Sequence, residues 1–181
     1  MSQPGRSVTE WAVLGLLAER PSHGFAIARQ LAAGSDVGRV LTVRRPLTYR
    51  ALDRLVVDGL AVRQHTEPGD AGPTRQICRI TPRGRRRLDE WLTEPVNHVR
   101  DLRIELLLKL VLLRRADRSS ESLIDRQRRA LTATFDALNR CADPDEDEVD
   151  VWRRHAAVAA SAFLDDLATG PPRRRATPRE E

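Results

Sequence analysis

The sequence has few cysteines and no long uncharged hydrophobic run, and both absences narrow the class of protein. Cys78 and Cys141 are the only cysteines in 181 residues. They are too few and too far apart for a disulfide framework, so we expect reduced thiols and a cytoplasmic protein. A membrane-spanning helix is excluded because it needs about 18 or more consecutive apolar residues. The N-terminal residues also lack the basic-then-apolar order of a signal peptide.

Motifs for catalysis and metal binding are missing as well. The four histidines and two cysteines show no ligand spacing such as C-x-x-C, so we predict no metal site. The stretch Asp143-x-Asp145-x-Asp147 resembles a calcium loop, but it lacks the central glycine, and Arg154 replaces the closing glutamate. No nucleophile elbow, phosphate loop or dinucleotide fingerprint is present. We therefore predict a protein that is not an enzyme and needs no cofactor.

What the sequence has in excess is arginine, and the excess is local. Lys109 is the only lysine among 31 basic residues. Residues 39–87 hold 12 arginines against 4 acidic residues, so this segment has a net charge of +8. Such a concentration of positive charge suits a polyanion-binding module. A solvated basic face without a partner is the alternative interpretation of the charge alone.

The basic segment contains a predicted amphipathic helix from Pro46 to about Asp58, with proline in its first turn and Gly59 after its end. At about 100° per residue, one side of this helix is mostly apolar and the other is mostly basic. The first side carries Thr48, Leu52, Leu55 and Val56; the second carries Arg50, Arg54 and Val57, with Tyr49 on the flank. Two β-like runs, 60–67 and 75–80, then flank a Gly/Pro-rich turn. This order is typical of a winged helix, a DNA-binding fold.

Two helices are predicted before this segment and one directly after it. Ser7 and Glu10 form a capping-box pattern for an almost wholly apolar helix that ends near residue 19. Ser22 is expected to cap a second helix that ends near residue 33. Thr81 and Pro82 begin a third that ends near residue 93. The residues of the second helix expected to face inward are Phe25, Ala28, Leu31 and Ala32.

The C-terminal half is predicted to be all helix, in three segments: 99 to about 115, from a cap at Ser119 or Ser120 to about 141, and from about Asp145 or Glu148 to 168. Because three amphipathic helices without a sheet do not easily close a large core, we expect their apolar stripes to be buried in a homodimer. A self-contained three-helix bundle is the alternative. The predicted fold is therefore mainly α, with an α+β winged-helix DNA-binding domain at 1–95, a helical dimerisation domain at 96–168 and a disordered tail at 169–181.

Three patterns in register resemble the PadR family of bacterial transcriptional regulators, in the type with a longer C-terminal domain. The patterns are Leu16-Leu17-x-x-x-Pro21-x-His23-Gly24-Phe25-x-Ile27, then Tyr49-x-x-Leu52-x-Arg54-Leu55-x-x-x-Gly59-Leu60, then Arg75-x-x-x-x-Ile80-Thr81-x-x-Gly84. The resemblance covers about residues 10–168, and it implies dimerisation through the C-terminal helices and repression of transcription. The chain departs from the family at Pro46-Leu47, Arg50 and Cys78, so we expect its operator to differ.

The candidate DNA-binding residues come from the basic helix, its approach, the second helix and the wing. Arg50 and Arg54, one turn apart, can contact guanine or phosphate through their guanidinium groups. Tyr49 can donate to a phosphate or pack on the second helix, and His23 can bind phosphate at a helix N-terminus or form a local turn. The complete set is Ser22, His23, Arg44, Arg45, Thr48, Tyr49, Arg50, Arg54, Thr74 and Arg75.

Candidate effector-binding residues are fewer. Trp11, Trp91 and Trp152 could line a cavity for a small aromatic effector between subunits, or they could be ordinary core residues. Cys78, near Arg75 and Arg79, could be a redox sensor or a small strand residue.

We therefore predict a cytoplasmic, homodimeric transcriptional regulator that binds specific sequences of double-stranded DNA. The resemblance implies a repressor that a small-molecule effector releases. The alternative is a winged-helix protein-interaction module without sequence-specific DNA binding.

Overall fold

The computed structural model describes residues 5–67, 74–139 and 147–169. The chain forms two compact units. Unit 1 comprises Met1–Glu94 and Asp101–Ser120, and unit 2 comprises Pro95–Arg100 and Glu121–Glu181. None of the helices in the described ranges has the length and apolar character needed to cross a membrane. The wing tip, the stretch around Asp143 and the predicted tail beyond Thr169 lie outside the described residues.

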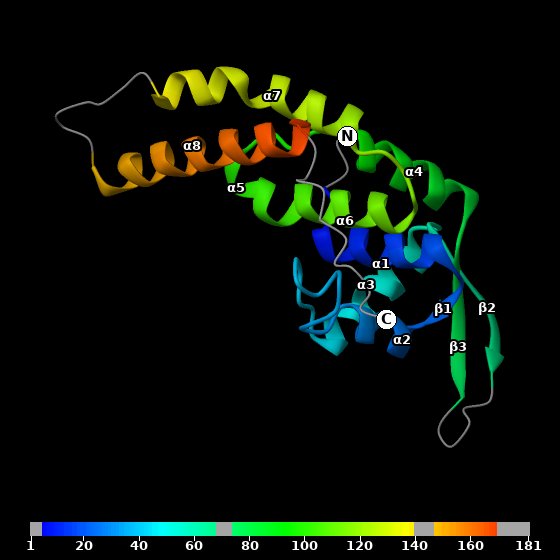
Figure 1. Cartoon of the computed structure of the whole chain (residues 1–181). Coiled ribbons are helices and arrows are strands. Elements are labelled where there is room, and N and C mark those ends of the chain that lie inside the picture. The colour runs from blue at the N-terminus through cyan, green and yellow to red at the C-terminus, as the bar shows by residue number, and fades with distance from the viewer. Residues whose placement is uncertain (1–4, 68–73, 140–146, 170–181) are drawn as a thin grey trace, which may run out of the picture. The chain divides into compact units, whose positions relative to one another are not determined.

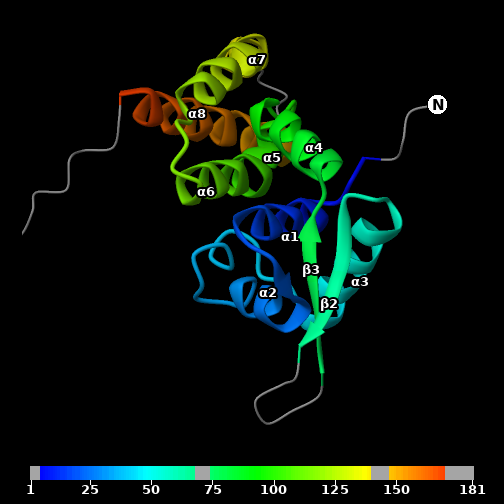
Figure 2. The same cartoon turned by 90° about the vertical axis from the view of Figure 1, so that its right-hand side faces the viewer.

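Unit 1 contains a winged helix, which confirms the predicted fold class (Figure 2). Its elements are α1 (Val8–Glu19), β1 (Ser22–His23), α2 (Gly24–Gln30), α3 (Arg45–Val57), β2 (Ala61–Glu67), β3 (Arg75–Ile80) and α4 (Pro82–Thr93). The three strands form an antiparallel sheet in the order β1-β3-β2. β2 and β3 form the wing, and their register shifts between Arg63 and Thr66.

The ends of three helices are located by the residues that the sequence patterns indicated. The Ser7 hydroxyl accepts a hydrogen bond from the Glu10 backbone N–H at 3.3 Å, and the Thr81 hydroxyl accepts one from the Gly84 N–H at 3.0 Å. Pro46 lies in the first turn of α3. Gly59, at φ +68°, follows the end of α3, in a conformation that favours glycine. These local signals therefore determine where α1 and α4 begin and where α3 begins and ends.

The prediction for the second helix was wrong in its cap and its length. Ser22 and His23 pair with Cys78 and Ile77 as strand β1, because β3 offers them backbone partners. His23, not Ser22, caps α2, since its Nδ1 accepts a hydrogen bond from the Ala26 N–H at 3.2 Å. Of the residues expected to face inward, Ala28 and Leu31 are buried, whereas Phe25 and Ala32 are exposed.

The segment after residue 98 is not one continuous helix. It divides into α5 (Val99–Asp101), a π-helical turn η1 (Leu102–Leu106) and α6 (Leu107–Arg115). The predicted apolar stripe of this segment is already covered within the chain, because Leu102, Leu106 and Leu113 are buried. These residues are therefore not free to form an interface with a second copy.

Lys109, the only lysine, is completely buried in unit 1. Its Nζ lies 2.9 Å from Glu105 Oε1 and donates a hydrogen bond to the Glu94 carbonyl at 2.7 Å. Trp91 Nε1 donates to the same Glu105 oxygen at 2.9 Å, and the Trp91 ring centroid is 4.8 Å from Lys109 Nζ. Trp91 also stacks on Trp11, with ring centroids 5.0 Å apart. This network joins α4 to the segment that contains η1 and α6.

Further polar contacts explain why α6 belongs to the same compact unit as the winged helix. Arg115 Nε lies 2.6 Å from Glu19 Oε1, and Arg114 Nη2 lies 2.8 Å from Asp36 Oδ1. Compactness thus groups residues 101–120 with 1–94. The functional boundary at residue 95 stays a prediction.

Unit 2 is built on two antiparallel helices, α7 (Glu121–Asn139) and α8 (Glu148–Thr169), which lie side by side (Figure 1). The buried apolar residues between them are Leu123, Ile124, Leu131 and Phe135 of α7 with Ala157 and Leu164 of α8. Gln127, also buried, accepts from the Val96 N–H at 2.8 Å and donates to the Val96 carbonyl at 2.9 Å.

Thr48, on the buried side of α3, is expected to lower the free energy of unfolding. Its side chain is completely buried, and among the described residues its hydroxyl has no hydrogen-bond partner. Thr48→Val removes the unsatisfied hydroxyl at nearly constant shape, so we expect the free energy of unfolding to rise by about 1 kcal/mol. Urea denaturation measures this change. A loss of stability would show instead that the hydroxyl finds a partner in solution.

Candidate nucleic-acid interface

Helix α3 buries one side in unit 1 and offers the other to solvent. Thr48, Ala51, Leu52 and Leu55 are buried. Arg50, Arg54 and Val57 are exposed, so the division of the helix into a buried and a basic outer side agrees with the prediction from helical periodicity. Arg50 forms no ion pair with any described residue, and Arg54 lies 3.6 Å from Asp58 at the exposed end of the helix. Both guanidinium groups are therefore available to a ligand.

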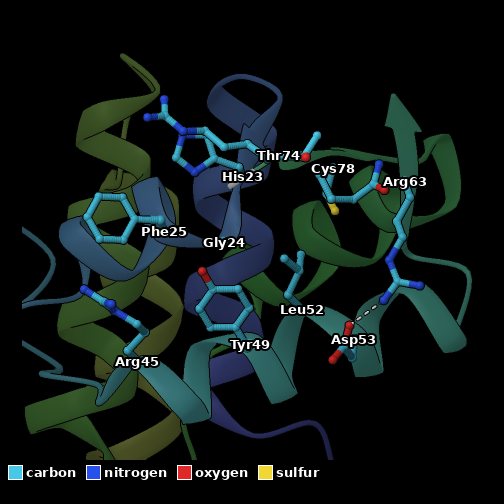
Figure 3. Close-up of a pocket in the computed structure, with 12 residues that line it drawn as sticks. His23, Gly24, Phe25, Arg45, Tyr49, Leu52, Asp53, Arg63, Thr74 and Cys78 are labelled. Carbon is cyan, nitrogen blue, oxygen red and sulfur yellow. Dashed lines mark hydrogen bonds and ion pairs between the residues drawn. The ribbon is translucent and has the colours of Figure 1, made fainter. Parts of the chain in front are cut away.

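A groove of about 560 Å³ lies between α2, α3 and the wing (Figure 3). We call it the wing groove. Its lining residues are His23, Gly24 and Phe25 at α2, Arg45, Tyr49, Leu52 and Asp53 of α3, and Arg63, Thr74, Arg75, Gln76 and Cys78 of the wing. The groove brings together half of the predicted DNA-binding residues: His23, Arg45, Tyr49, Thr74 and Arg75.

One wall of the wing groove is aromatic and cationic. The Arg45 guanidinium carbon lies 4.8 Å from the centroid of the Phe25 ring. The Phe25 and His23 rings are nearly parallel, with centroids 6.3 Å apart. Phe25 was predicted to face the core, but its ring is exposed on this wall. The ring therefore forms an aromatic surface beside the Arg45 guanidinium group.

Tyr49 both packs on α2 and faces the groove. A Cβ at position 24 would lie 2.6 Å from Tyr49 Cε1, so Gly24 is needed for this close approach. Tyr49 nevertheless remains 41% exposed. The two interpretations of Tyr49, packing and ligand contact, are therefore compatible.

A second groove, of about 970 Å³, runs along the other side of α3. We call it the flank groove. It is lined by Leu47, Arg50, Arg54 and Val57 of α3, together with residues that include Arg6, Arg83 and Arg87. Arg6 is already paired with Glu10 and Asp58, each at 2.9 Å. Arg54 lies near Asp58 and Arg87 pairs with Glu90, so Arg50 of α3 and Arg83 of α4 are the arginines of this groove without an ion pair among the described residues.

Asp53 and Arg63 were not among the predicted site residues. Arg63 Nη2 of β2 lies 2.6 Å from Asp53 Oδ1 of α3, so the pair ties the helix to the wing (Figure 3). Asp53 is an acidic residue inside the most basic segment of the chain. That contrast was a signal in the sequence, but its partner became visible only in the fold.

Three of the predicted DNA-binding residues lie outside the wing groove's lining and away from the exposed side of α3. Ser22 is buried in β1, and Thr48 is buried under α3. Neither side chain is offered to a ligand in this structure. Arg44 is exposed at the N-cap of α3.

The three tryptophans do not form one cluster. Trp11 and Trp91 are buried and stacked on each other in unit 1. Trp152, on α8 of unit 2, is 72% exposed. Only Trp152 therefore has a ring that an additional molecule can contact.

Cys78 forms part of the floor of the wing groove and is buried. Burial raises the pKa of its thiol; Arg63 lowers the pKa and Asp53 raises it, both by smaller amounts. A raised pKa keeps the thiol protonated near neutral pH, and the protonated form is a poor nucleophile. We expect Cys78 in the folded protein to react slowly with iodoacetamide at pH 7.5 and rapidly in urea, as peptide mapping can measure. Rapid alkylation in the folded state would support the redox-sensor interpretation instead.

Within residues 5–67, 74–139 and 147–169, no group of histidine, cysteine and acidic side chains is arranged to hold a metal ion. Asp147 precedes α8 and caps its first turn, since its Oδ1 accepts hydrogen bonds from the N–H groups of Val149 and Asp150, both at 2.9 Å. The other aspartates of the calcium-like stretch lie outside the described residues.

The structure resembles three solved proteins at low sequence identity. Bacillus subtilis PadR in complex with operator DNA shares 18% identity, with 92% of this chain and 98% of that chain covered and a TM-score of 0.49. The protein smu.1604c from Streptococcus mutans UA159 shares 16%, with 88% and 98% covered and a TM-score of 0.43. Bacillus subtilis PadR alone shares 16%, with 93% and 97% covered and a TM-score of 0.42.

No curated protein matches the sequence. A family model does match it: residues 13–90 fit the transcriptional regulator PadR-like family. The matched range runs from α1 into α4 and includes α3 and the wing. The winged-helix part of this chain therefore belongs to the PadR-like family of transcriptional regulators.

Proposed function

We propose that this chain is a cytoplasmic, sequence-specific DNA-binding repressor that acts as a homodimer. The observation that carries the proposal is the wing groove beside the exposed basic side of α3. It unites residues of α2, α3 and the wing that are distant in sequence, and three of its lining residues are arginines. Binding to a DNA duplex needs such a combination, because one element must enter a groove of the DNA while others hold its phosphate backbone.

In this proposal α3 enters the major groove. Arg50 and Arg54 face base edges, where an arginine can donate two hydrogen bonds to guanine O6 and N7. Arg45 and Arg75 line the wing groove and are the candidates for phosphate contacts. Phosphate contacts position the protein, and base contacts select the sequence.

Dimerisation is assigned to α8. Val149, Trp152, Ala156, Ala159 and Phe163 recur at intervals of three and four residues, so they share one side of the helix. Val149, Trp152 and Ala159 are exposed, and Ala156 and Phe163 are half-buried. A second copy seated on this stripe would remove an apolar surface from water. It would also provide two copies of α3 for half-sites about one helical turn of DNA apart.

Trp152→Asp tests the dimer. A carboxylate in the centre of an apolar interface is strongly disfavoured, so we expect sedimentation equilibrium to show a shift from dimer to monomer at micromolar concentration. Because Trp152 is exposed within the chain, the helical circular dichroism should not change. Arg153→Asp, one residue away and exposed, is the matched control. An unchanged dimer in the Trp152 variant would remove α8 from the interface.

Repression follows if the dimer covers promoter DNA, and release follows if a small aromatic effector favours a form that cannot bind DNA. Because Trp152 lies on the stripe that we assign to dimerisation, we assign it to an effector cavity between the two subunits, in place of a cavity with all three tryptophans. A promoter–reporter assay tests the direction of regulation: deletion of the gene should raise reporter expression. Lower expression would indicate an activator.

A titration at two salt concentrations tests DNA binding itself. Six phosphate contacts per dimer would lower the affinity roughly 1,000-fold between 50 and 200 mM salt. We expect a labelled random duplex to bind at low salt with this steep dependence. If no binding is detected at low salt, the winged helix is a scaffold for protein interaction instead.

A further inference from the structure

Asp53 places a carboxylate on the surface that we assign to DNA. Its side chain is 63% exposed, and among the described residues it is the only acidic one that lines the wing groove, beside three arginines. A negative charge on this surface weakens every phosphate contact near it, because phosphates carry the same charge. A surface that served only to hold the backbone would thus be better without Asp53.

The position of the carboxylate is fixed on one side only. Arg63 Nη2 contacts Asp53 Oδ1 at 2.6 Å, and no described residue donates a hydrogen bond to Oδ2. Figure 3 shows the pair at the end of the groove formed by α3 and β2. Asp53 therefore retains one oxygen that can accept a hydrogen bond from a ligand.

The donors that a carboxylate can meet in the major groove are few. Cytosine presents its N4 amino group, and adenine presents its N6 amino group beside the N7 acceptor. The lone pair of N7 repels a carboxylate, so cytosine is the better partner. Building on the proposed function, we propose that Asp53 accepts a hydrogen bond from cytosine N4 and so determines specificity at one base pair, with Arg63 as its positioning residue.

The spacing along α3 supports this assignment. Asp53 follows Arg50 by three residues, or about 4.5 Å along the helix axis. Successive base pairs are about 3.4 Å apart. Arg50 as a donor to guanine and Asp53 as an acceptor from cytosine can therefore contact neighbouring base pairs.

The alternative is that Asp53 only ties α3 to the wing. The two roles predict different affinities of the variants for a random duplex and for a specific one. If Asp53 contacts a base, Asp53→Ala loses the preference for cytosine at that base pair. It should still bind a random duplex as tightly as the wild type or a few-fold more tightly, because a negative charge is gone. Arg63→Ala should bind the same random duplex more weakly, because a positive charge is gone. If Asp53 only ties α3 to the wing, Asp53→Ala and Arg63→Ala should change the affinity for the random duplex in the same direction.

The experiment begins with selection of duplexes from a randomised library by the full-length wild-type protein. We expect the selected duplexes to share a cytosine at one fixed position. Replacing it with N4-methylcytosine keeps the pair with guanine but covers the amino hydrogen that faces the major groove. Affinity of the wild type should then fall about tenfold, the effect of one lost base contact. Asp53→Ala should bind the methylated and unmethylated duplexes equally.

The outcomes separate this inference from the proposed function. If the wild type selects a sequence but tolerates the methyl group, or if Asp53→Ala keeps the cytosine preference, the assignment of Asp53 is overturned and the regulator remains. If the wild type selects no sequence at all, the proposed sequence-specific function fails first. Thermal denaturation of Asp53→Ala and Arg63→Ala should match the wild type, since both side chains are exposed.

Discussion

Simultaneous replacement of Arg50 and Arg54 by alanine is expected to lower the affinity for a selected duplex by about 100-fold or more. Each arginine that contacts a guanine contributes about 1–3 kcal/mol of discrimination, and the two side chains are on the same exposed side of α3. The fold should survive, because Arg50 has no ion pair among described residues and the Arg54–Asp58 contact at 3.6 Å is exposed. Fluorescence anisotropy with the selected and a random duplex measures the effect.

The control for this pair removes equal charge elsewhere. Arg129→Ala with Arg153→Ala lowers the net charge by the same two units on exposed positions of α7 and α8. We expect this control to bind the selected duplex within a few-fold of the wild type. If it loses as much affinity as the Arg50/Arg54 variant, only total charge matters and α3 is not the reading element. If the Arg50/Arg54 variant loses equally on both duplexes, these arginines contact phosphate and not bases.

Lys109→Met is expected to destabilise the protein by about 2–4 kcal/mol. The substitution keeps the volume but removes the cation from a site that is completely buried. The Glu94 carbonyl and the Glu105 carboxylate would then lose a partner at 2.7 and 2.9 Å. Removing one member of a buried pair is costly because the other is left unsatisfied. The partial exposure of Glu105 keeps the expected loss below that of a fully buried pair. Urea denaturation measures the change.

A second substitution distinguishes the buried network from simple loss of packing. Glu105→Gln removes the unpaired charge but can still accept the hydrogen bond from Trp91 Nε1. The double variant Lys109→Met with Glu105→Gln should therefore be more stable than Lys109→Met alone. Equal or lower stability of the double variant would show that the unpaired charge of Glu105 does not cause the loss.

The elements that present the site could be predicted because their signals are local. Pro46 and Gly59 bracket α3, Thr81 and Pro82 begin α4, and the apolar and basic sides of α3 follow from its periodicity. None of these features depends on a residue far away in the sequence. The same reasoning identified five of the residues that line the wing groove, without knowing that they line one groove: His23, Arg45, Tyr49, Thr74 and Arg75.

The features that were missed depend on distant partners. Ser22 and His23 read as a helix start, but β3, more than 50 residues later, pairs with them as a strand. The sequence shows Lys109 only as the single lysine, and its partners in the interior, Glu105 and the Glu94 carbonyl, become visible only in the fold. In the sequence, Asp53 only lowers the net positive charge of the basic segment. Its contact with Arg63, visible only in the structure, shows that the carboxylate is held in place. Sequence patterns describe a side of a helix but not what covers it.

Photo-crosslinking from two exposed aromatic positions tests the central claim most directly. Tyr49 in the wing groove and Trp152 on α8 are each replaced by p-benzoylphenylalanine, and each protein is irradiated with a labelled selected duplex. The proposed function predicts a protein–DNA product from position 49 and a protein–protein product, without DNA, from position 152. No DNA product from position 49, or a DNA product from position 152 alone, would contradict it.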